Sequence, residues 1–176
     1  SDLERLDELL KRVLEKARKL VKENDEHSEE VRKTVEKVVR DNDKLAEDLA
    51  DKVEKIRDED TVRKLAEDLK RISEKLLREV EELVRRNDEL SKKILDDVRK
   101  LVERLIREAE DLLRKKDEER VKEVLDRVDE ILKRVIKAAE ESLKRSHEIN
   151  RRLIKAAEDS LRRVKKILDE LEERVR

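Results

Sequence analysis

The chain has 176 residues, of which 56% are charged and 35% hydrophobic, and it contains no Gly, Pro, Cys, Met, Trp, Tyr or Phe. Average usage would give roughly a dozen Gly and about nine Pro in a chain of this length. The 49 basic and 50 acidic residues nearly cancel, which argues against a self-repelling disordered chain and against a nucleic-acid binder. Without cysteine, neither disulfides nor thiolate metal sites can form, so the sequence does not indicate whether the protein resides in an oxidising or a reducing compartment.

Membrane signals are also missing from the sequence. No apolar run approaches the roughly 20 residues needed to span a bilayer, and no secretory h-region is recognisable. Helices that lie on a membrane usually carry aromatic anchors and a cationic polar face, and both are lacking. We therefore expect a soluble protein without membrane contact, cytoplasmic on recombinant expression.

Apolar residues recur in steps of three and four, which is the period of an α-helix, along three stretches. The stretches run from Leu3 to Ile56, from Val62 to Leu113 and from Val121 to Leu171. Each covers about 55 residues, or about 80 Å of helix. The sequence predicts an all-α fold, an elongated antiparallel (up-down-up) three-helix bundle or coiled coil that forms a single domain over residues 1–176.

The predicted helices cover about residues 2–57, 61–115 and 118–175. Between them the apolar spacing widens, and Asp60 and Asp117 are placed to act as N-caps, where a carboxylate accepts the free N–H groups of the first turn. Both connections are short, and this favours antiparallel neighbours.

An alternative interpretation breaks the first stretch between Asn24 and Ser28. Ser28 followed by two glutamates resembles the start of a helix. The apolar phase runs straight through this point, so we favour an unbroken helix.

Polar residues recur inside the apolar stripes at an interval of about five helical turns, which we call the layer interval. They pair as Asn24 with Asn42, Ser73 with Ser91, and Ser142 with Ser160. Reversing the middle helix brings one member of each pair to a common level, so Asn24, Ser91 and Ser142 should meet, as should Asn42, Ser73 and Ser160. The predicted buried polar network has twelve members: Asn24, His27, Ser28, Asn42, Ser73, Asn87, Ser91, Ser142, Ser146, His147, Asn150 and Ser160.

Such a network has a physical use in a uniform aliphatic core. A buried polar group without a partner costs about 1 to 3 kcal/mol, whereas a fully paired network is tolerated and penalises every register that breaks it. The segments 134–145 and 152–163 are near-copies separated by the same layer interval. Hydrogen-bond layers that specify helix register explain this recurrence better than a site for chemistry.

This combination of alphabet, layer spacing and short capped loops resembles de novo designed helical bundles with modular buried hydrogen-bond networks. The resemblance covers the whole chain. It implies a hyperstable scaffold, or a component of a heterodimer, a cage or a pH-responsive assembly.

The two histidines, His27 and His147, fall near the middle of the predicted bundle at almost the same level. Carboxylate-bridged di-iron bundles place a glutamate three residues before each histidine, but these positions hold Asn24 and Lys144. We therefore expect no metal site, and we predict that both histidines belong to the buried network. A neutral buried histidine must lose its partners or bury a charge when protonated, so a pH-responsive variant of this interpretation predicts lower stability in mild acid.

Two further features are candidate binding surfaces, one for nucleic acid and one for another helix. The basic cluster around Lys144, Arg145, Arg151 and Arg152 alternates with glutamates at the spacing of helical ion pairs, and no aromatic residue is available for base stacking. On the third helix Ala138, Ile149 and Ala156 lie off the main stripe, either as helix formers on the flank, which we favour, or as a groove for another helix.

The function predicted from the sequence is a designed structural scaffold with no natural biochemical activity. We expect no catalytic residue, cofactor, metal, small molecule or nucleic acid, and a monomeric state. The alternative is a helix-binding or homo-oligomerising component of a designed assembly, made pH-responsive by His27 and His147.

Overall fold

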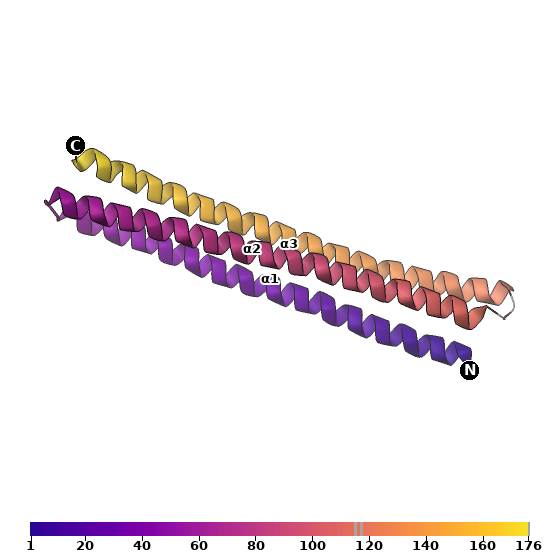
Figure 1. Cartoon of the computed structure of the whole chain (residues 1–176). Helices are drawn as coiled ribbons and strands as arrows, with labels where there is room; N and C mark the ends of the chain where they lie inside the picture. The colour runs from indigo at the N-terminus through magenta and orange to yellow at the C-terminus, as the bar shows by residue number, and fades with distance from the viewer. Residues whose placement is uncertain (115, 117, 176) are drawn as a thin grey trace. The chain divides into compact units, whose positions relative to one another are not determined.

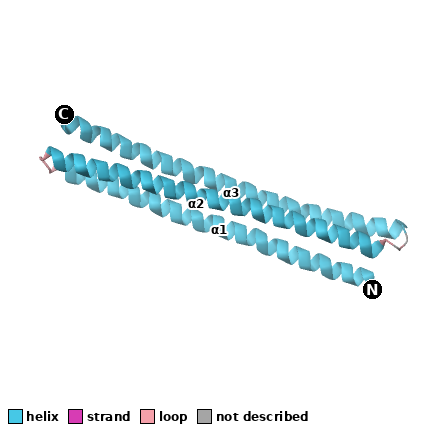
Figure 2. Cartoon of the chain, viewed as in Figure 1, coloured by secondary structure: helices cyan, strands magenta, loops and turns pink. Residues whose placement is uncertain are grey.

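The structure is a computed structural model that describes residues 1–114, 116 and 118–175. It consists of three long helices, α1 (Asp2–Glu54), α2 (Glu59–Leu113) and α3 (Glu118–Val175), joined by two short connections (Figure 2). Their lengths are 53, 55 and 58 residues. The prediction of an all-α, three-helix fold is confirmed. Within the described residues, no helix combines the length and the apolar content that crossing a membrane requires.

The chain divides into two compact units, and each unit contains a segment of all three helices. The first unit comprises residues 1–28 and 88–147, and the second comprises residues 29–87 and 148–176. In each unit the segment of α2 runs antiparallel to the segments of α1 and α3, in the predicted up-down-up order (Figure 1). That the chain forms one domain stays a prediction.

The core of the first unit is aliphatic and follows the apolar stripes of the three helices. Side chains three and four residues apart lie on one face of each helix, so each stripe can be removed from water against the other two. One cluster contains Leu6, Val102, Leu105, Ala109, Leu113, Val128 and Leu132. A second cluster contains Ala17, Leu95, Val98 and Ala139.

The second unit has a core of the same kind, and its clusters follow one another along the stripes. Valine and leucine dominate, and alanine occurs in two of the clusters. The clusters are Val31, Val35, Val80, Leu153 and Ala157; Ala46, Leu69 and Val164; and Val53, Val62 and Leu171.

The N-cap of α2 is Asp58, which corrects the prediction of Asp60. Oδ1 of Asp58 accepts the backbone N–H of Asp60 at 3.3 Å, and Oδ2 accepts the hydroxyl of Thr61 at 2.7 Å. The helix begins at Glu59, two residues earlier than predicted, so Asp60 lies in the first turn, where its charge still suits the helix dipole. At α1, Oγ of Ser1 lies 3.3 Å from the N–H of Glu4 that it caps.

The C-terminal end of α1 is capped by a side chain from α3. The guanidinium of Arg174 donates to the carbonyl oxygens of Val53, Glu54 and Ile56 at 2.5, 2.8 and 3.1 Å. The last carbonyls of a helix lack partners within it, and this chain has no glycine to form the usual left-handed cap. Arg174 therefore replaces a local cap with a contact between helices.

The proposed break of the first helix between Asn24 and Ser28 is wrong, because α1 continues through these residues. The uninterrupted apolar phase outweighs the local resemblance to a helix start. The other predicted N-cap, Asp117, lies outside the described residues.

The alanines of α3 settle which side chains form its core face. Ala139 is 3% exposed and Ala157 is 5% exposed, and both belong to core clusters. By contrast, Ala138 is exposed and Ala156 is half-buried. Ile149 is half-buried and packs against the Val31 cluster. Ala138 and Ala156 thus lie on the flank, as the favoured interpretation predicts.

We expect the adjacent substitutions Ala138→Glu and Ala139→Glu to have very different effects on stability. A carboxylate at the exposed position 138 should change the free energy of unfolding by less than about 0.5 kcal/mol. At position 139 it would enter a closed aliphatic cluster without a partner and should cost about 3 kcal/mol or more. Guanidinium unfolding followed by circular dichroism measures both, and equal losses would contradict the assigned core face.

Candidate functional site

Ten of the twelve polar residues predicted for the network are buried, namely all of its Asn and Ser members. Each is at most 5% exposed, although the side chains are polar. They lie on the same helix faces as the aliphatic core, because their spacing follows the apolar stripes. The ten are Asn24, Ser28, Asn42, Ser73, Asn87, Ser91, Ser142, Ser146, Asn150 and Ser160.

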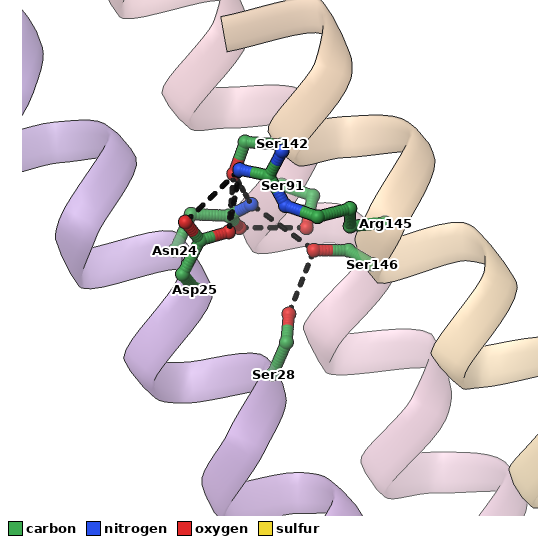
Figure 3. Close-up of polar contacts among 7 residues, drawn as sticks. All are labelled: Asn24, Asp25, Ser28, Ser91, Ser142, Arg145 and Ser146. Carbon is green, nitrogen blue, oxygen red and sulfur yellow. Dashed lines mark hydrogen bonds and ion pairs between the residues drawn. The ribbon is translucent and has the colours of Figure 1, made fainter. Parts of the chain in front are cut away.

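In the first unit, five of these residues form what we call the Asn24 network: Asn24, Ser28, Ser91, Ser142 and Ser146 (Figure 3). Nδ2 of Asn24 donates to Oγ of Ser142 at 2.9 Å and to Oγ of Ser146 at 3.0 Å. Its Oδ1 accepts the hydroxyl of Ser91 at 2.7 Å, and Ser28 shares a 2.7 Å hydrogen bond with Ser146. One carboxamide therefore uses both of its N–H donors and its oxygen to connect α1 with α2 and α3.

The second unit contains a smaller set, which we call the Asn42 network: Asn42, Ser73 and Ser160. Nδ2 of Asn42 donates to Oγ of Ser160 at 3.0 Å, and Oδ1 of Asn42 accepts the hydroxyl of Ser73 at 3.0 Å. Again a carboxamide on α1 contacts both other helices. The two networks bring together the two sets of three residues that the layer interval predicts at a common level.

Each network extends to the surface through an aspartate and an arginine that sequence reasoning missed. Ser142 donates its hydroxyl to Oδ1 of Asp25 at 2.8 Å, and Arg145 pairs with Asp25 at 3.1 Å. In the Asn42 network, the hydroxyl of Ser160 donates to Oδ1 of Asp43 at 2.7 Å. The carboxylate directs each serine hydroxyl, so that its oxygen lone pairs face the carboxamide N–H.

The Asp43 carboxylate binds Arg163 through two hydrogen bonds. Nε of Arg163 donates to Oδ1 at 3.2 Å, and a terminal nitrogen donates to Oδ2 at 2.6 Å. These hydrogen bonds raise the pKa of the Arg163 guanidinium, although desolvation acts in the opposite direction. The side chain of Asp43 is 29% exposed, so this pair lies at the edge of the core.

A sequence signal for these residues does exist. Each carboxamide of α1 is followed directly by aspartate, as Asn24-Asp25 and Asn42-Asp43, and the serines that these carboxamides bind at Ser142 and Ser160 are each followed three residues later by arginine. The arginines Arg145 and Arg163 repeat at the same layer interval as the serines. The signal was missed because exposed charges are so frequent in this chain that one more pair does not stand out.

A third Asn-Asp dipeptide, Asn87-Asp88, lies on α2. Nδ2 of Asn87 donates to Oδ1 of Asn150 at 2.9 Å within the second unit. In the part of the chain that the structure describes, Nδ2 of Asn150 is buried without an acceptor. The Asn150 carboxamide is therefore less completely hydrogen-bonded than the Asn24 carboxamide.

His27 and His147 are not buried, which corrects their assignment to the buried network. Both are half-buried, and the side chain of His147 is 43% exposed. His147 directly follows the buried Ser146, so the helix rotates its imidazole by about 100° away from the core face. The pH-responsive interpretation depended on neutral histidines enclosed in the core, and this structure does not place them there.

His147 instead contacts a carboxylate of α2. Its Nδ1 lies 2.8 Å from Oδ1 of Asp88, a buried oxygen, so the contact is a hydrogen bond when Nδ1 carries the proton. The other carboxylate oxygen lies 3.1 Å from the ammonium of Lys92. His27 also has an interaction partner. Across the described residues, no three His, Cys, Asp or Glu side chains gather as metal ligands would.

Two members of the basic cluster of α3, Arg145 and Arg152, form ion pairs. Arg145 pairs with Asp25 of α1, and Arg152 pairs with Glu148 on its own helix at 2.9 Å. The pair of Arg152 follows the helical spacing that the sequence indicates, whereas the pair of Arg145 joins two helices.

No protein-family model matches this chain, and no curated protein shows significant sequence similarity to it. Among solved structures, one described as a computationally designed three helix bundle is similar to it, with 23% sequence identity and a TM-score of 0.47. The similarity covers 98% of this chain and 84% of that one.

Removing the central carboxamide should destabilise the first network more than the second. Asn24→Ala removes three hydrogen bonds and should cost about 2 to 3 kcal/mol, while Asn42→Ala removes two and should cost about 1 to 2 kcal/mol. The serine hydroxyls can recover part of the loss by bonding to backbone carbonyls of their own helices. Chemical unfolding of the three proteins measures the difference.

An apolar replacement of the whole Asn24 network is the control. With Asn24→Leu and alanine at its four serines, no member of the network remains as an unpaired polar group, so most of the lost stability should return. A replacement as unstable as Asn24→Ala would mean that packing, rather than hydrogen bonding, causes the loss.

The carboxylate of Asp43 should contribute measurably to stability. Asp43→Asn removes the ion pair with Arg163 and weakens the acceptor of Ser160, and we expect a loss of about 1 kcal/mol because the pair is partly screened by solvent. The matched control is Asp51→Asn, an exposed aspartate on the same helix, which should leave the unfolding midpoint unchanged. Equal unfolding midpoints for the two variants would mean that the Asp43 carboxylate does not contribute to the stability of the network.

Proposed function

We propose that this chain is a designed structural scaffold with no natural biochemical activity, in which the buried Asn and Ser layers specify the register of three helices. The restricted alphabet supports a designed origin, since glycine, proline, cysteine, methionine and all aromatic residues are missing from 176 positions. The layer interval also supports it, because the same polar layer is used twice.

The observation that carries the proposal is that Asn24 and Asn42 each form hydrogen bonds to both of the other helices. A hydrogen bond to one other helix would fix the axial alignment of one pair of helices only. A carboxamide that contacts α2 and α3 at once fixes all three segments of its unit at a single level. Each unit therefore contains its own register-defining layer.

Shifted alignments of the helices differ from the native alignment mainly in the surroundings of the polar layers. Sliding one helix by a heptad still places aliphatic residues against aliphatic residues, so the apolar core alone discriminates weakly. The same shift moves each polar group about 10 Å along the axis, away from its partners and against hydrocarbon. At about 1 to 3 kcal/mol for each unpaired group, the displaced polar layers dominate the free-energy difference between the shifted and the native alignment.

The test is a variant in which every buried asparagine is replaced by leucine and every buried serine by alanine. Spin labels at Arg12→Cys and Lys93→Cys, two exposed positions of the first unit, report the alignment of α1 and α2. The native protein should give one narrow distance distribution. The apolar variant should give a broad or multiple distribution, because a slip of one heptad changes the axial offset by about 10 Å.

The chain has no cysteine of its own, so the spin labels attach only at the two substituted positions. Light scattering on each protein must accompany the distances, since a mass near 21.1 kDa means that the three stripes cover one another within one chain. A multiple of that mass for the native protein would favour the homo-oligomeric alternative. A single narrow distribution for the monomeric apolar variant would overturn the assignment of register to the polar layers.

A further inference from the structure

An open groove lies between α1 and α2 in the first unit, outside the polar networks. Its volume is ≈ 520 Å³. Four residues from each helix line it: Lys16, Lys19, Leu20 and Glu23 from α1, and Asp97, Lys100, Leu101 and Arg104 from α2.

The floor of the groove is apolar. Leu20 and Leu101 are half-buried, so each presents part of its side chain to solvent from opposite sides of the groove. The buried part of Leu20 packs against the core cluster of Ala17, Leu95, Val98 and Ala139. A groove with two leucines over a closed core offers apolar contact without any rearrangement of the helices.

The rim of the groove is cationic. Four basic residues, contributed by both helices, line it against two acidic ones. Lys100 is paired, with its ammonium 3.0 Å from Asp96. Within the described residues, Lys16, Lys19 and Arg104 have no carboxylate within the 4.0 Å of an ion pair, and all three are exposed.

The lack of pairing is informative because ion pairs one helical turn apart are common on this surface. Lys11 pairs with Asp7 at 3.2 Å, and Lys133 pairs with Asp129 at 3.0 Å. At the groove, cations from two helices converge instead on one apolar strip. Carboxylates brought in from outside would meet unneutralised charge there.

We propose that this groove is a docking surface for an amphipathic helix with acidic flanks, supplied by a partner chain. Apolar side chains of that helix pack between Leu20 and Leu101, and its glutamates or aspartates pair with Lys16, Lys19 and Arg104 on both rims. This is helix-in-groove recognition, with charge setting the choice of partner. The proposal is independent of the scaffold role, since the groove contains no member of the polar networks.

The occupant is a partner helix rather than a second copy of this chain, because this chain has 49 basic and 50 acidic residues and does not bring the acidic excess that the rim would bind. The groove is short, so the complex is weak and transient in character. Its affinity must also fall with salt, because the rim charges are solvent-exposed and are screened within about 10 Å at 0.1 M ionic strength.

The probe is a fluorescent synthetic helix of about 21 residues with Leu at positions a and d, Glu at positions e and g and Ala elsewhere. A second peptide has Lys in place of every Glu. Fluorescence anisotropy with the full chain at low salt should give saturable binding of the Glu peptide with one site per chain. The Lys peptide should bind at least tenfold more weakly.

Two charge-reversed variants locate the site. Lys19→Glu with Arg104→Glu should weaken binding of the Glu peptide at least tenfold. The control Lys122→Glu with Arg127→Glu changes the net charge equally on exposed positions of α3 and should leave the affinity within twofold. Circular dichroism must show the same helix content for all three proteins, because every substituted position is exposed.

The contribution of apolar contact to binding is tested by Leu101→Ser. This substitution keeps the rim charges and removes one of the two leucines of the groove floor. It should weaken the Glu peptide at least threefold, and purely electrostatic attraction would leave its affinity unchanged. The proposal is overturned by absence of saturable binding, by equal binding of both peptides, by equal loss in the two charge-reversed variants, or by a native dimer that the groove variant converts to a monomer.

Discussion

The hydrogen bonds of two buried carboxamides are the constraint on which the rest of this structure depends. Asn24 and Asn42 each project from α1 into an aliphatic core and bond to serines of both other helices. A shift of one helix along its axis would move these groups away from their partners and against hydrocarbon, where an unpaired polar group is costly. Hydrophobic burial supplies most of the driving force for folding, and the proposed role of the carboxamides is to select among the ways of achieving it.

The aspartates that follow these asparagines show how such a network ends without leaving a polar group unpaired. Ser142 and Ser160 accept from the carboxamides and donate to Asp25 and Asp43. Each aspartate is partly exposed and pairs with an arginine at the surface. Polarity therefore increases stepwise from the core to water, and no charge has to be fully desolvated.

The remainder of the molecule is consistent with a scaffold whose surface chemistry is mostly self-neutralising. Pairs three and four residues apart cover much of the surface, Arg174 caps the carbonyls of α1, and the imidazole of His147 lies beside Asp88. The groove between α1 and α2 in the first unit departs from this pattern, because three of its four cations form no ion pair within the described residues and lie beside partly exposed leucines. An acidic helix would find complementary contacts at this groove, as proposed above.

Helix length, helix order and the meeting of Asn24 with Ser91 and Ser142 all follow from the sequence by itself, because a period of 3.6 residues and short connections determine which residues share a face and a level. Only the tertiary structure decided that Asp25 and Asp43 complete the networks and that the histidines lie on the flank. These details depend on rotations of a few tens of degrees about each helix axis. A repeating aliphatic pattern leaves those rotations open, and packing against two neighbouring helices determines them.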